Sequence, residues 1–345
     1  MFFKIKIICL FTAISIGIAA YCNSSTTSDS NINTRPHTSK VSEGVSLPKK
    51  NDRGGHAAGM IDNSLVVSGG TRWSEDKTEK IFLNNTLILK GNKWHNGPSL
   101  PFPMAYSMFA HDKSGLYIAG GTSDGETMLK EVYRLQSIQE GSRWEKLPDL
   151  PEPVGFGAGT ILNNTFFVSG GMLNNGKSSN KMWRLNLNDI NSGWSECPVI
   201  PGNPRYLHAM TANNNNLYII GGLAKGSPLT PLNDIYEFNS RENSWKRLKD
   251  IPFIGYAWVA QPVNNKYLLL TGRADGNIYT GIWIINLDNM AVRKIDDLII
   301  QAATAPLVKV FKNEWWLVGG EPDSKKNRTG KISIINITCN DYENN

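Results

Sequence analysis

Short apolar runs recur along the chain, and each ends in a pair of small residues. Val, Ile, Leu and aromatic residues dominate these runs, and polar residues and turn formers separate them, which predicts β-strands rather than helices. The pairs stand 51, 50, 51, 51 and 47 residues apart. They are Gly69-Gly70, Gly120-Gly121, Gly170-Gly171, Gly221-Gly222, the degenerate Gly272-Arg273 and Gly319-Gly320. This constant period predicts a repeat architecture.

A second landmark follows four of the pairs at a fixed distance. A Trp lies about 24 residues after the pair, and a Pro lies seven residues further on, as in Trp94 and Pro101. In the fifth unit, Val292 and Ile299 take these places. The sixth unit ends before its own copy, which is found near the start of the chain as Val41 and Pro48. We therefore expect an N-terminal strand to close the last unit and remove an exposed sheet edge.

This pattern resembles the kelch repeat, whose period is about 50 residues. It covers residues 41–338. The resemblance implies an all-β, six-bladed kelch-type β-propeller over residues 41–345, with four antiparallel strands in each blade and the last blade closed by an N-terminal strand. The Gly pairs would then end the second strands where blades pack tightly, and the Trp residues would pack between blades. We assign no chemistry to these residues.

The N-terminus predicts export. Lys4 and Lys6 precede an apolar run over 7–20 that ends in small residues, which is typical of a secretory signal peptide and short for a membrane span. We expect a signal peptide over 1–22 and a flexible Ser/Thr/Asn-rich tether over 23–40. The mature protein would be periplasmic or secreted, with no membrane span. Cys22 leaves a lipoprotein as an alternative, which the bulky Tyr21 before it disfavours.

Composition narrows the class of protein. The chain has 345 residues, of which 19% are charged and 40% hydrophobic, with 32 Gly and 17 Pro. These values exclude a largely disordered chain, a coiled coil and a polytopic membrane protein. The net charge of +6 is spread without a block of Lys or Arg, so we expect no nucleic-acid partner.

The repeat also predicts where a ligand would bind. Strand direction alternates within a blade, so the loops after each Gly pair and those before each innermost strand meet on one face, around the central channel. The first set of positions is Thr71, Thr122, Met172, Leu223, Ala274 and Glu321, and the second is Arg53, Tyr106, Phe156, Arg205-Tyr206, Tyr256 and Ala303. Guanidinium groups bind carboxylates, and aromatic faces suit the C–H faces of sugars. The set predicts a small acidic sugar as ligand, although each residue could instead cap a strand or pack against the next blade.

Glu321 and Arg328 form the sharpest pair among these candidates. Both lie in one short loop, in the stretch WWLVGGEPDSKKNRTG, with turn formers Pro322 to Ser324 between them. A carboxylate and a guanidinium held together could act as a base and an anion clamp. The alternative is a solvated loop with incidental charges.

Three stretches resemble the bacterial N-acetylneuraminate epimerases, the periplasmic sialic acid mutarotases. They are WSECPVIPGNPRYLHAMTANNNNLYIIGG (194–222), NSLVVSGG with the following LILKGNKWHNGPSL, and the Glu321 loop. In that family the Glu of this loop is the proposed acid/base and the Arg a substrate-binding partner. The blades stand in rotated order, like those of a cyclically permuted branch. The Glu321–Arg328 spacing is one residue longer than in the family, and the insert at 71–82 is shorter.

The resemblance implies an exported isomerase that interconverts the α and β anomers of N-acetylneuraminate by general acid–base catalysis of ring opening. Glu321 would transfer the proton. The substrate-binding residues would be Arg328, Arg205, Arg53, Tyr206, Tyr106 and Tyr256. We expect no metal and no cofactor.

Three alternatives remain open at this stage. One is a sialic acid- or carbohydrate-binding propeller without catalysis, and another is a protein-interaction scaffold. The third is a copper enzyme like galactose oxidase, which needs a Cys–Tyr cofactor and paired His ligands. Cys197 and Cys339 stand at unsuitable places for it, and His56 and His208 lie far apart in the repeat.

Overall fold

A computed structural model of the chain describes residues 37–274, 277–278, 281–298 and 303–339. The expected signal peptide and most of the expected tether lie outside these residues. The described part belongs to one compact unit, Pro36–Asn345. Its first strand, β1 (His37–Glu43), begins before the expected boundary at residue 41. Within the described residues no helix is long and apolar enough to cross a membrane.

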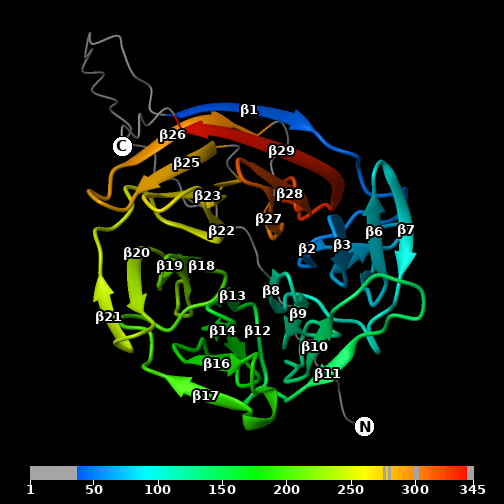
Figure 1. The fold of residues 1–345 in the computed structure, drawn as a ribbon, viewed down its shortest axis with the longest axis horizontal. Coiled ribbons are helices and arrows are strands. Elements are labelled where there is room, and N and C mark those ends of the chain that lie inside the picture. Colours follow the sequence, from blue (N-terminus) through cyan, green and yellow to red (C-terminus); the bar gives the residue numbers. More distant parts are fainter. Residues whose placement is uncertain (1–36, 275–276, 279–280, 299–302, 340–345) are drawn as a thin grey trace. The chain divides into compact units, whose positions relative to one another are not determined.

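The described strands form a β-propeller-like arrangement in which antiparallel sheets follow one another (Figure 1). Four of the expected blades are separate four-stranded sheets. In chain order their strands are β2 (Ala57–Ile61), β3 (Ser64–Ser68), β6 (Thr86–Lys90) and β7 (Lys93–Gly97); β8 (Met108–Asp112), β9 (Gly115–Ala119), β10 (Val132–Leu135) and β11 (Glu145–Leu147); β13 (Ala158–Leu162), β14 (Thr165–Ser169), β16 (Met182–Asn186) and β17 (Trp194–Cys197); β27 (Leu307–Phe311), β28 (Glu314–Gly320) and β29 (Thr329–Cys339) with β1.

The other two expected blades lie within a nine-stranded sheet. One backbone pair, Leu232 with Gly255, connects its two halves. The first half is β18 (Ala209–Asn213), β19 (Asn216–Ala224), β20 (Thr230–Asn239) and β21 (Ser244–Arg247). The second is β22 (Gly255–Pro262), β23 (Tyr267–Ala274), β24 (Asn277–Ile278), β25 (Gly281–Asn286) and β26 (Val292–Asp297). We call each of these six groups of strands a strand set and number them in chain order from β2.

Three small elements complete the described secondary structure. Two are the two-stranded sheets β4 (Thr71–Trp73) with β5 (Lys80–Phe82), and β12 (Val154–Gly155) with β15 (Met172–Leu173). The third is a 3₁₀ turn, η1 (Ile190–Ser192). Both small sheets involve the segments that follow a Gly pair, on the face where the sequence predicts a site.

The N-terminal strand closes the last strand set, as predicted. β1 pairs antiparallel with β29 along its whole length, from His37 opposite Cys339 to Glu43 opposite Ser333. Figure 1 shows this blue strand against the red one at the outer edge. The strand that would otherwise be an open edge is therefore covered by a segment almost 300 residues away in sequence.

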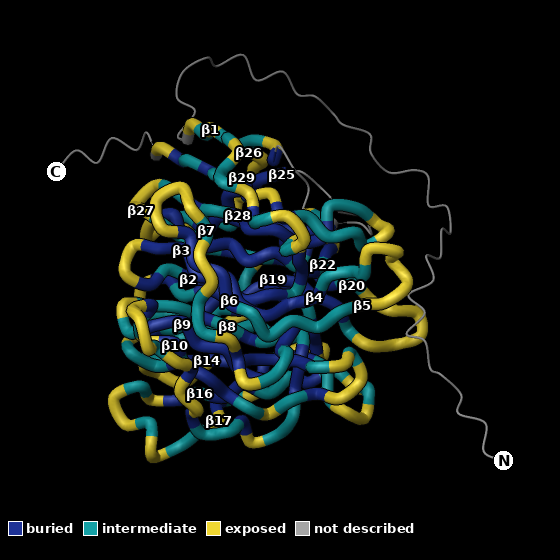
Figure 2. Tube along the Cα trace, turned by 90° about the vertical axis from the view of Figure 1, so that its right-hand side faces the viewer, coloured by how far each residue is buried: buried dark blue, intermediate teal, exposed yellow. Residues whose placement is uncertain are grey.

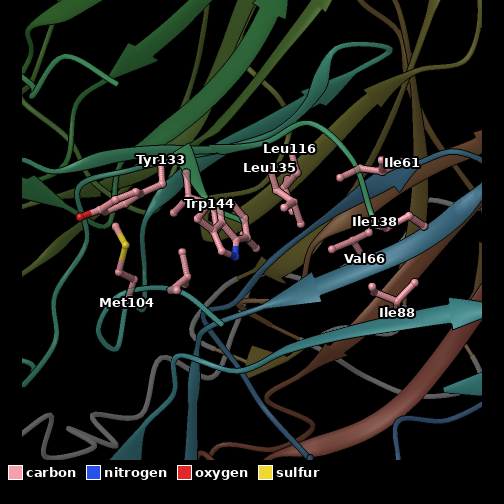
Figure 3. Packing of buried hydrophobic residues seen from close by; sticks show 12 residues of the cluster. Ile61, Val66, Ile88, Met104, Leu116, Tyr133, Leu135, Ile138 and Trp144 are labelled. Atoms are coloured by element: carbon pink, nitrogen blue, oxygen red, sulfur yellow. The ribbon is translucent and has the colours of Figure 1, made fainter. Parts of the chain in front are cut away.

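Six apolar clusters hold the strand sets together, and each cluster joins one set to the next. Figure 3 shows the first, in which Ile61, Val66 and Ile88 of the first set lie near Leu116 and Leu135 of the second. The sixth cluster joins β27–β29 back to β2, β3 and β6. Burial is concentrated in the strands, and the loops carry most of the exposed residues (Figure 2). The closed sequence of clusters explains why no single set needs a core of its own.

The repeated Gly and Trp residues are structural, as predicted. Gly69 has φ +67°, and a Cβ there would lie 2.2 Å from the carbonyl oxygen of Met104 in the connection to the next set. The four Trp indoles donate hydrogen bonds to a backbone carbonyl near the preceding outer strand. These bonds are Trp94 to Ser46 (2.7 Å), Trp144 to Pro98 (2.9 Å), Trp194 to Pro148 (2.8 Å) and Trp245 to Pro198 (2.9 Å).

Candidate functional site

A series of backbone hydrogen bonds connects the residues at the mouth of the channel. Just before each innermost strand, or within its first residues, one residue adopts a left-handed conformation with φ between 52° and 65°. These mouth residues are Gly55, Tyr106, Phe156, Leu207, Ala257 and Thr304. Five consecutive N–H···O bonds connect them, from Gly55 donating to Thr304 (2.9 Å) to Ala257 donating to Leu207 (2.7 Å). The positive φ costs energy in each non-glycine residue, and these bonds between neighbouring mouth residues hold the strained turns in place.

A cavity of about 710 Å³ runs along the channel, lined by the innermost strand of every set. All six mouth residues line it. Its volume is that of a pocket for a small molecule. Glu321 and Arg328 lie outside this lining, but Tyr106 belongs to it and its hydroxyl oxygen lies 3.1 Å from Nη2 of Arg328. Tyr106 therefore connects the cavity with the Glu321 loop.

The structure brings Glu321 and Arg328 together as a buried ion pair. Nη1 of Arg328 lies 3.0 Å from Oε1 of Glu321, and their side chains are 2% and 8% exposed, respectively. Glu321 follows the last Gly pair, where its backbone pairs with Ala303, and Arg328 immediately precedes β29. The loop between them is braced by Asp323, whose side chain accepts hydrogen bonds from the backbone and side-chain nitrogens of Asn327. The solvated-loop alternative is therefore wrong.

Every nitrogen of the Arg328 guanidinium has a partner. Nε donates to the carbonyl oxygen of Thr71, Nη1 contacts Glu321 and donates to the carbonyl oxygen of Lys326, and Nη2 donates to the hydroxyls of Thr71 and Tyr106. Burial and the negative charge of Glu321 raise the pKa of Tyr106. Its hydroxyl consequently stays protonated at neutral pH and can donate a hydrogen bond.

Aromatic and cationic groups cover this cluster. The Tyr106 ring stacks on Phe156 with centroids 4.5 Å apart. Trp73 of β4 donates its indole N–H to the carbonyl oxygen of Lys326 (2.8 Å) and lies 6.0 Å from the Arg328 guanidinium. The Lys80 ammonium lies 5.9 Å from both the Trp73 and the Tyr106 ring. The β4–β5 hairpin thus fixes the Glu321 loop and places a cation beside it.

Tyr206 and Tyr256 form a second group with Arg273. Tyr206 and Tyr256 each occupy the position before a mouth residue. The Tyr256 hydroxyl accepts a hydrogen bond from Nη1 of Arg273 (3.0 Å), and the guanidinium lies 5.4 Å from the Tyr256 ring centroid. Burial, with a further contribution from the nearby Tyr256, raises the pKa of Tyr206 to about 12. The aromatic candidates thus divide into two groups, one with Arg328 and one with Arg273.

Arg53 and Arg205 do not face the mouth. Both are fully buried, two residues before a mouth residue, and each guanidinium bonds to the chain itself. Nη1 donates to Gly69 in one case and to Gly221 in the other, both at 3.1 Å. Arg205 also binds both carboxylate oxygens of Asp234, at 2.6 and 2.8 Å. Because each guanidinium nitrogen is bonded within the chain and both side chains are fully buried, the structure gives these arginines a role in holding strand ends.

His56 and His208 lie next to the mouth residues and belong to the lining of the cavity, although both are largely buried. His56 and His208 each follow a mouth residue and are 3% exposed. Nε2 of His208 lies 2.9 Å from Oγ of Ser169, and burial lowers the pKa of His208 to about 3. Burial likewise lowers the pKa of His56. Among the described residues no group of three or more His, Cys, Asp or Glu is arranged to hold a metal ion, and Cys197 is buried and unbridged.

Two polar residues at the mouth escaped the sequence analysis. Arg273 occupies the position after the Gly pair that we assigned to Ala274, because Tyr256 pairs with Arg273 and the strand register shifts by one residue. Gly272 alone replaces the pair there. Thr304 is the mouth residue of its set, and within the described part of the chain its buried hydroxyl has no hydrogen-bond partner. The break in the glycine repeat was the signal for Arg273.

Comparison with known proteins agrees with the repeat. A family model described as the KLHDC2/KLHL20/DRC7 Kelch-repeats domain matches residues 29–222 and 113–320. The chain is also 35% identical over 83 residues to the N-acetylneuraminate epimerase of Shigella sonnei (strain Ss046), covering 24% of this chain and 23% of that protein. It is 33% identical over 102 residues to that of Escherichia coli O139:H28, covering 28% of each chain.

These aligned segments span about a quarter of the curated epimerases, so they do not by themselves carry an activity to this chain. The kelch model covers most of the sequence. The sheet order and the six apolar clusters that join the strand sets agree with this model. The chain belongs to the kelch-repeat family, and a segment of it is similar to N-acetylneuraminate epimerases.

Proposed function

We propose that this protein is a mutarotase that interconverts the α and β anomers of N-acetylneuraminate. The observation that carries the proposal is the buried Glu321–Arg328 pair, which is joined to the channel cavity through Tyr106. The segmental similarity to the N-acetylneuraminate epimerases supports the substrate class. The fold alone would not, since propellers host unrelated functions.

The chemistry requires one base and one acid near the anomeric carbon. A base takes the proton of the anomeric hydroxyl while an acid protonates the ring oxygen, and the bond between the anomeric carbon and the ring oxygen breaks. Closure of the open-chain ketone from its other face reverses both proton transfers and gives the other anomer. We assign both roles to Glu321, which would take the proton of the anomeric hydroxyl as a carboxylate and deliver it to the ring oxygen as the acid. The Tyr106 hydroxyl, 3.1 Å from Arg328, would donate a hydrogen bond to a sugar oxygen. Such catalysis typically contributes about 10²–10⁴-fold in rate.

Arg328 is a positioning residue in this proposal. Because its nitrogens already contact Glu321, Thr71, Tyr106 and the loop backbone, it fixes the carboxylate and the phenol relative to each other. The stacked Tyr106 and Phe156 rings offer an aromatic face beside the cavity for the C–H face of a sugar. The Glu321 carboxylate and the Tyr106 hydroxyl are acid–base groups, which this reaction needs.

The test is the rate of anomer exchange. Freshly released α-N-acetylneuraminate would be followed by one-dimensional proton NMR with and without the purified protein. We expect a faster approach to the equilibrium mixture of anomers. An unchanged rate accompanied by sugar-dependent shifts of protein signals would replace this proposal with a carbohydrate-binding propeller. An unchanged rate without binding would favour the protein-interaction scaffold.

We further propose that the protein acts outside the cytoplasm, in the periplasm or as a secreted protein, because its first 22 residues have the pattern of a signal peptide. Cell fractionation with antibody detection tests this, and retention of the uncleaved chain in the cytoplasm would contradict it.

A further inference from the structure

Arg273 is a buried cation with two unused nitrogens. Arg273 is 8% exposed, and its Nη1 donates a hydrogen bond to the Tyr256 hydroxyl at 3.0 Å. Nε and Nη2 are buried and have no hydrogen-bond partner among the residues that the structure describes. A buried charged group without partners is costly, so such groups are normally paired. The unused nitrogens therefore call for a ligand.

Arg328, Arg53 and Arg205 differ from Arg273, because each of their guanidinium nitrogens has a partner. Arg328 uses all of its nitrogens on Glu321, Thr71, Tyr106 and the loop backbone. Arg53 donates from Nε, Nη1 and Nη2 to oxygens of Asn51 and Gly69. Arg205 does the same toward Asn203, Gly221 and Asp234. Of these four side chains, only Arg273 has guanidinium nitrogens that lack any hydrogen-bond partner among the described residues.

The free nitrogens of Arg273 have the geometry that a carboxylate needs. Nε–H and one Nη2–H point in parallel along one edge of the planar guanidinium, so they can donate to both oxygens of one carboxylate. The opposite side of the group is held by the Tyr256 hydroxyl, and its face lies over the Tyr256 ring. The guanidinium is thus oriented before any ligand arrives, which lowers the entropic cost of binding.

Arg273 also stands in the right place relative to Glu321. Arg273 pairs with Tyr256, and Glu321 pairs with Ala303, each of which immediately precedes a mouth residue. The two residues therefore occupy equivalent positions in neighbouring strand sets, at the same end of the channel. One ligand that carries a carboxylate next to its reacting carbon could engage both sets.

We propose that Arg273, held by Tyr256, is an anion-binding subsite that takes the carboxylate of the acidic sugar while Glu321 acts at the adjacent anomeric carbon. The identity of the sugar rests on the proposed function, whereas the need for an anion rests on the unpaired guanidinium. Arg273 thereby takes the substrate-binding role that the sequence predicted for Arg328, with Arg205 or Arg53.

The test compares an acid with its neutral ester. Binding of N-acetylneuraminate and of its methyl ester to the full chain would be measured by calorimetry for the wild type, Arg273→Gln and Arg273→Lys. Arg293→Gln is the matched control, since Arg293 is an exposed arginine of the same strand set. We expect Arg273→Gln to weaken binding of the acid by about 10- to 150-fold, the range for hydrogen bonds to charged groups. It should leave the affinity for the ester almost unchanged, and Arg293→Gln should change neither affinity.

Thermal stability without sugar separates this role from a structural one. Replacing an unpaired buried charge by a neutral amide should raise the Tm, because the cost of the buried charge disappears. A lower Tm or a failure of Arg273→Gln to fold would mean that Arg273 holds the structure, and would overturn the proposal. So would equal affinity of wild type and Arg273→Gln for the acid, even if the wild type is an active mutarotase. Arg273-dependent binding of the acid by a protein without mutarotase activity would uphold the subsite and reject the proposed function.

Discussion

Arg328 and Glu321 form an ion pair whose two members come from opposite ends of one loop, with Nη1 and Oε1 3.0 Å apart and both side chains more than nine-tenths buried. Through Arg328 the pair also contacts Thr71 in the next strand set and Tyr106 in the one after it. The loop is therefore fixed by groups from three strand sets. A change at Arg328 should reach Glu321 and Tyr106 together.

Arg328→Gln should destabilise the protein by about 3–5 kcal/mol, because it leaves the Glu321 carboxylate buried without its cation. Chemical unfolding of the wild type, of the two single variants and of Arg328→Gln with Glu321→Gln gives a double-mutant cycle. We expect the double variant to be more stable than Arg328→Gln alone, since no unpaired charge remains. A double variant that loses the sum of both single effects would show that the two residues are independent.

A second buried pair should matter for stability but not for the sugar. Asp234→Asn removes the anionic partner of Arg205, which is fully buried, and should cost about 3–5 kcal/mol of unfolding free energy. The control is Glu145→Gln, which breaks an Arg–Glu pair at the outer edge, where the Glu145 side chain is 49% exposed, and should cost less than about 1 kcal/mol. If Asp234→Asn keeps wild-type stability but loses affinity for N-acetylneuraminate, Arg205 belongs to the binding site after all.

The sequence predicts the strand order and the closing strand because glycine and tryptophan recur wherever sets must pack closely. It could not tell which side chains reach the mouth. The Pro of the Trp–Pro landmark lies seven residues before Gly55 (Pro48), six before Leu207 (Pro201) and five before Tyr106 (Pro101). An offset of four or five residues from that Pro therefore mixes three registers. It selects Arg53 and Arg205, which are fully buried, together with Tyr106, which lines the cavity.

The same reasoning explains why the sequence predicts the position of Glu321 but not that of Arg273. Glu321 follows an intact Gly pair, so its position can be read from the repeat. Arg273 stands where the pair loses a residue, and only the strand pairing of Tyr256 with Arg273 reveals its register. Local sequence patterns identify positions within a repeat, but insertions and deletions between repeats have to be located by the hydrogen bonds.

Acid should destabilise the protein partly through His208. Burial lowers the pKa of this residue to about 3 in the folded state, while the unfolded chain has the ordinary value of 6.5. The unfolded state thus binds the proton first. The contribution of His208 to the unfolding free energy is therefore fully present above pH 6.5 and is lost as the pH falls toward 3. His111, with a pKa lowered by burial to about 4, acts in the same direction.

His208→Gln isolates the contribution of His208. The wild type should lose about 2 kcal/mol through this residue between pH 7 and pH 5, from the difference in proton binding. Urea unfolding at the two pH values would measure it, and the variant should show a correspondingly smaller loss. Equal pH dependence in both proteins would mean that His208 is not buried in its neutral form.

Glu321→Gln tests the central claim most directly. This change keeps the size of the side chain and removes its ability to accept a proton. The control is Glu145→Gln, because Glu145 also pairs with an arginine but lies on the outer strand β11, away from the mouth. The decay of freshly released α-N-acetylneuraminate would be followed by proton NMR with each protein at equal concentration. We expect the wild type and Glu145→Gln to accelerate anomer exchange equally. Glu321→Gln should reduce the catalysed rate by about 10²-fold or more. Wild-type acceleration by Glu321→Gln would contradict the assignment of Glu321 as the proton-transferring group.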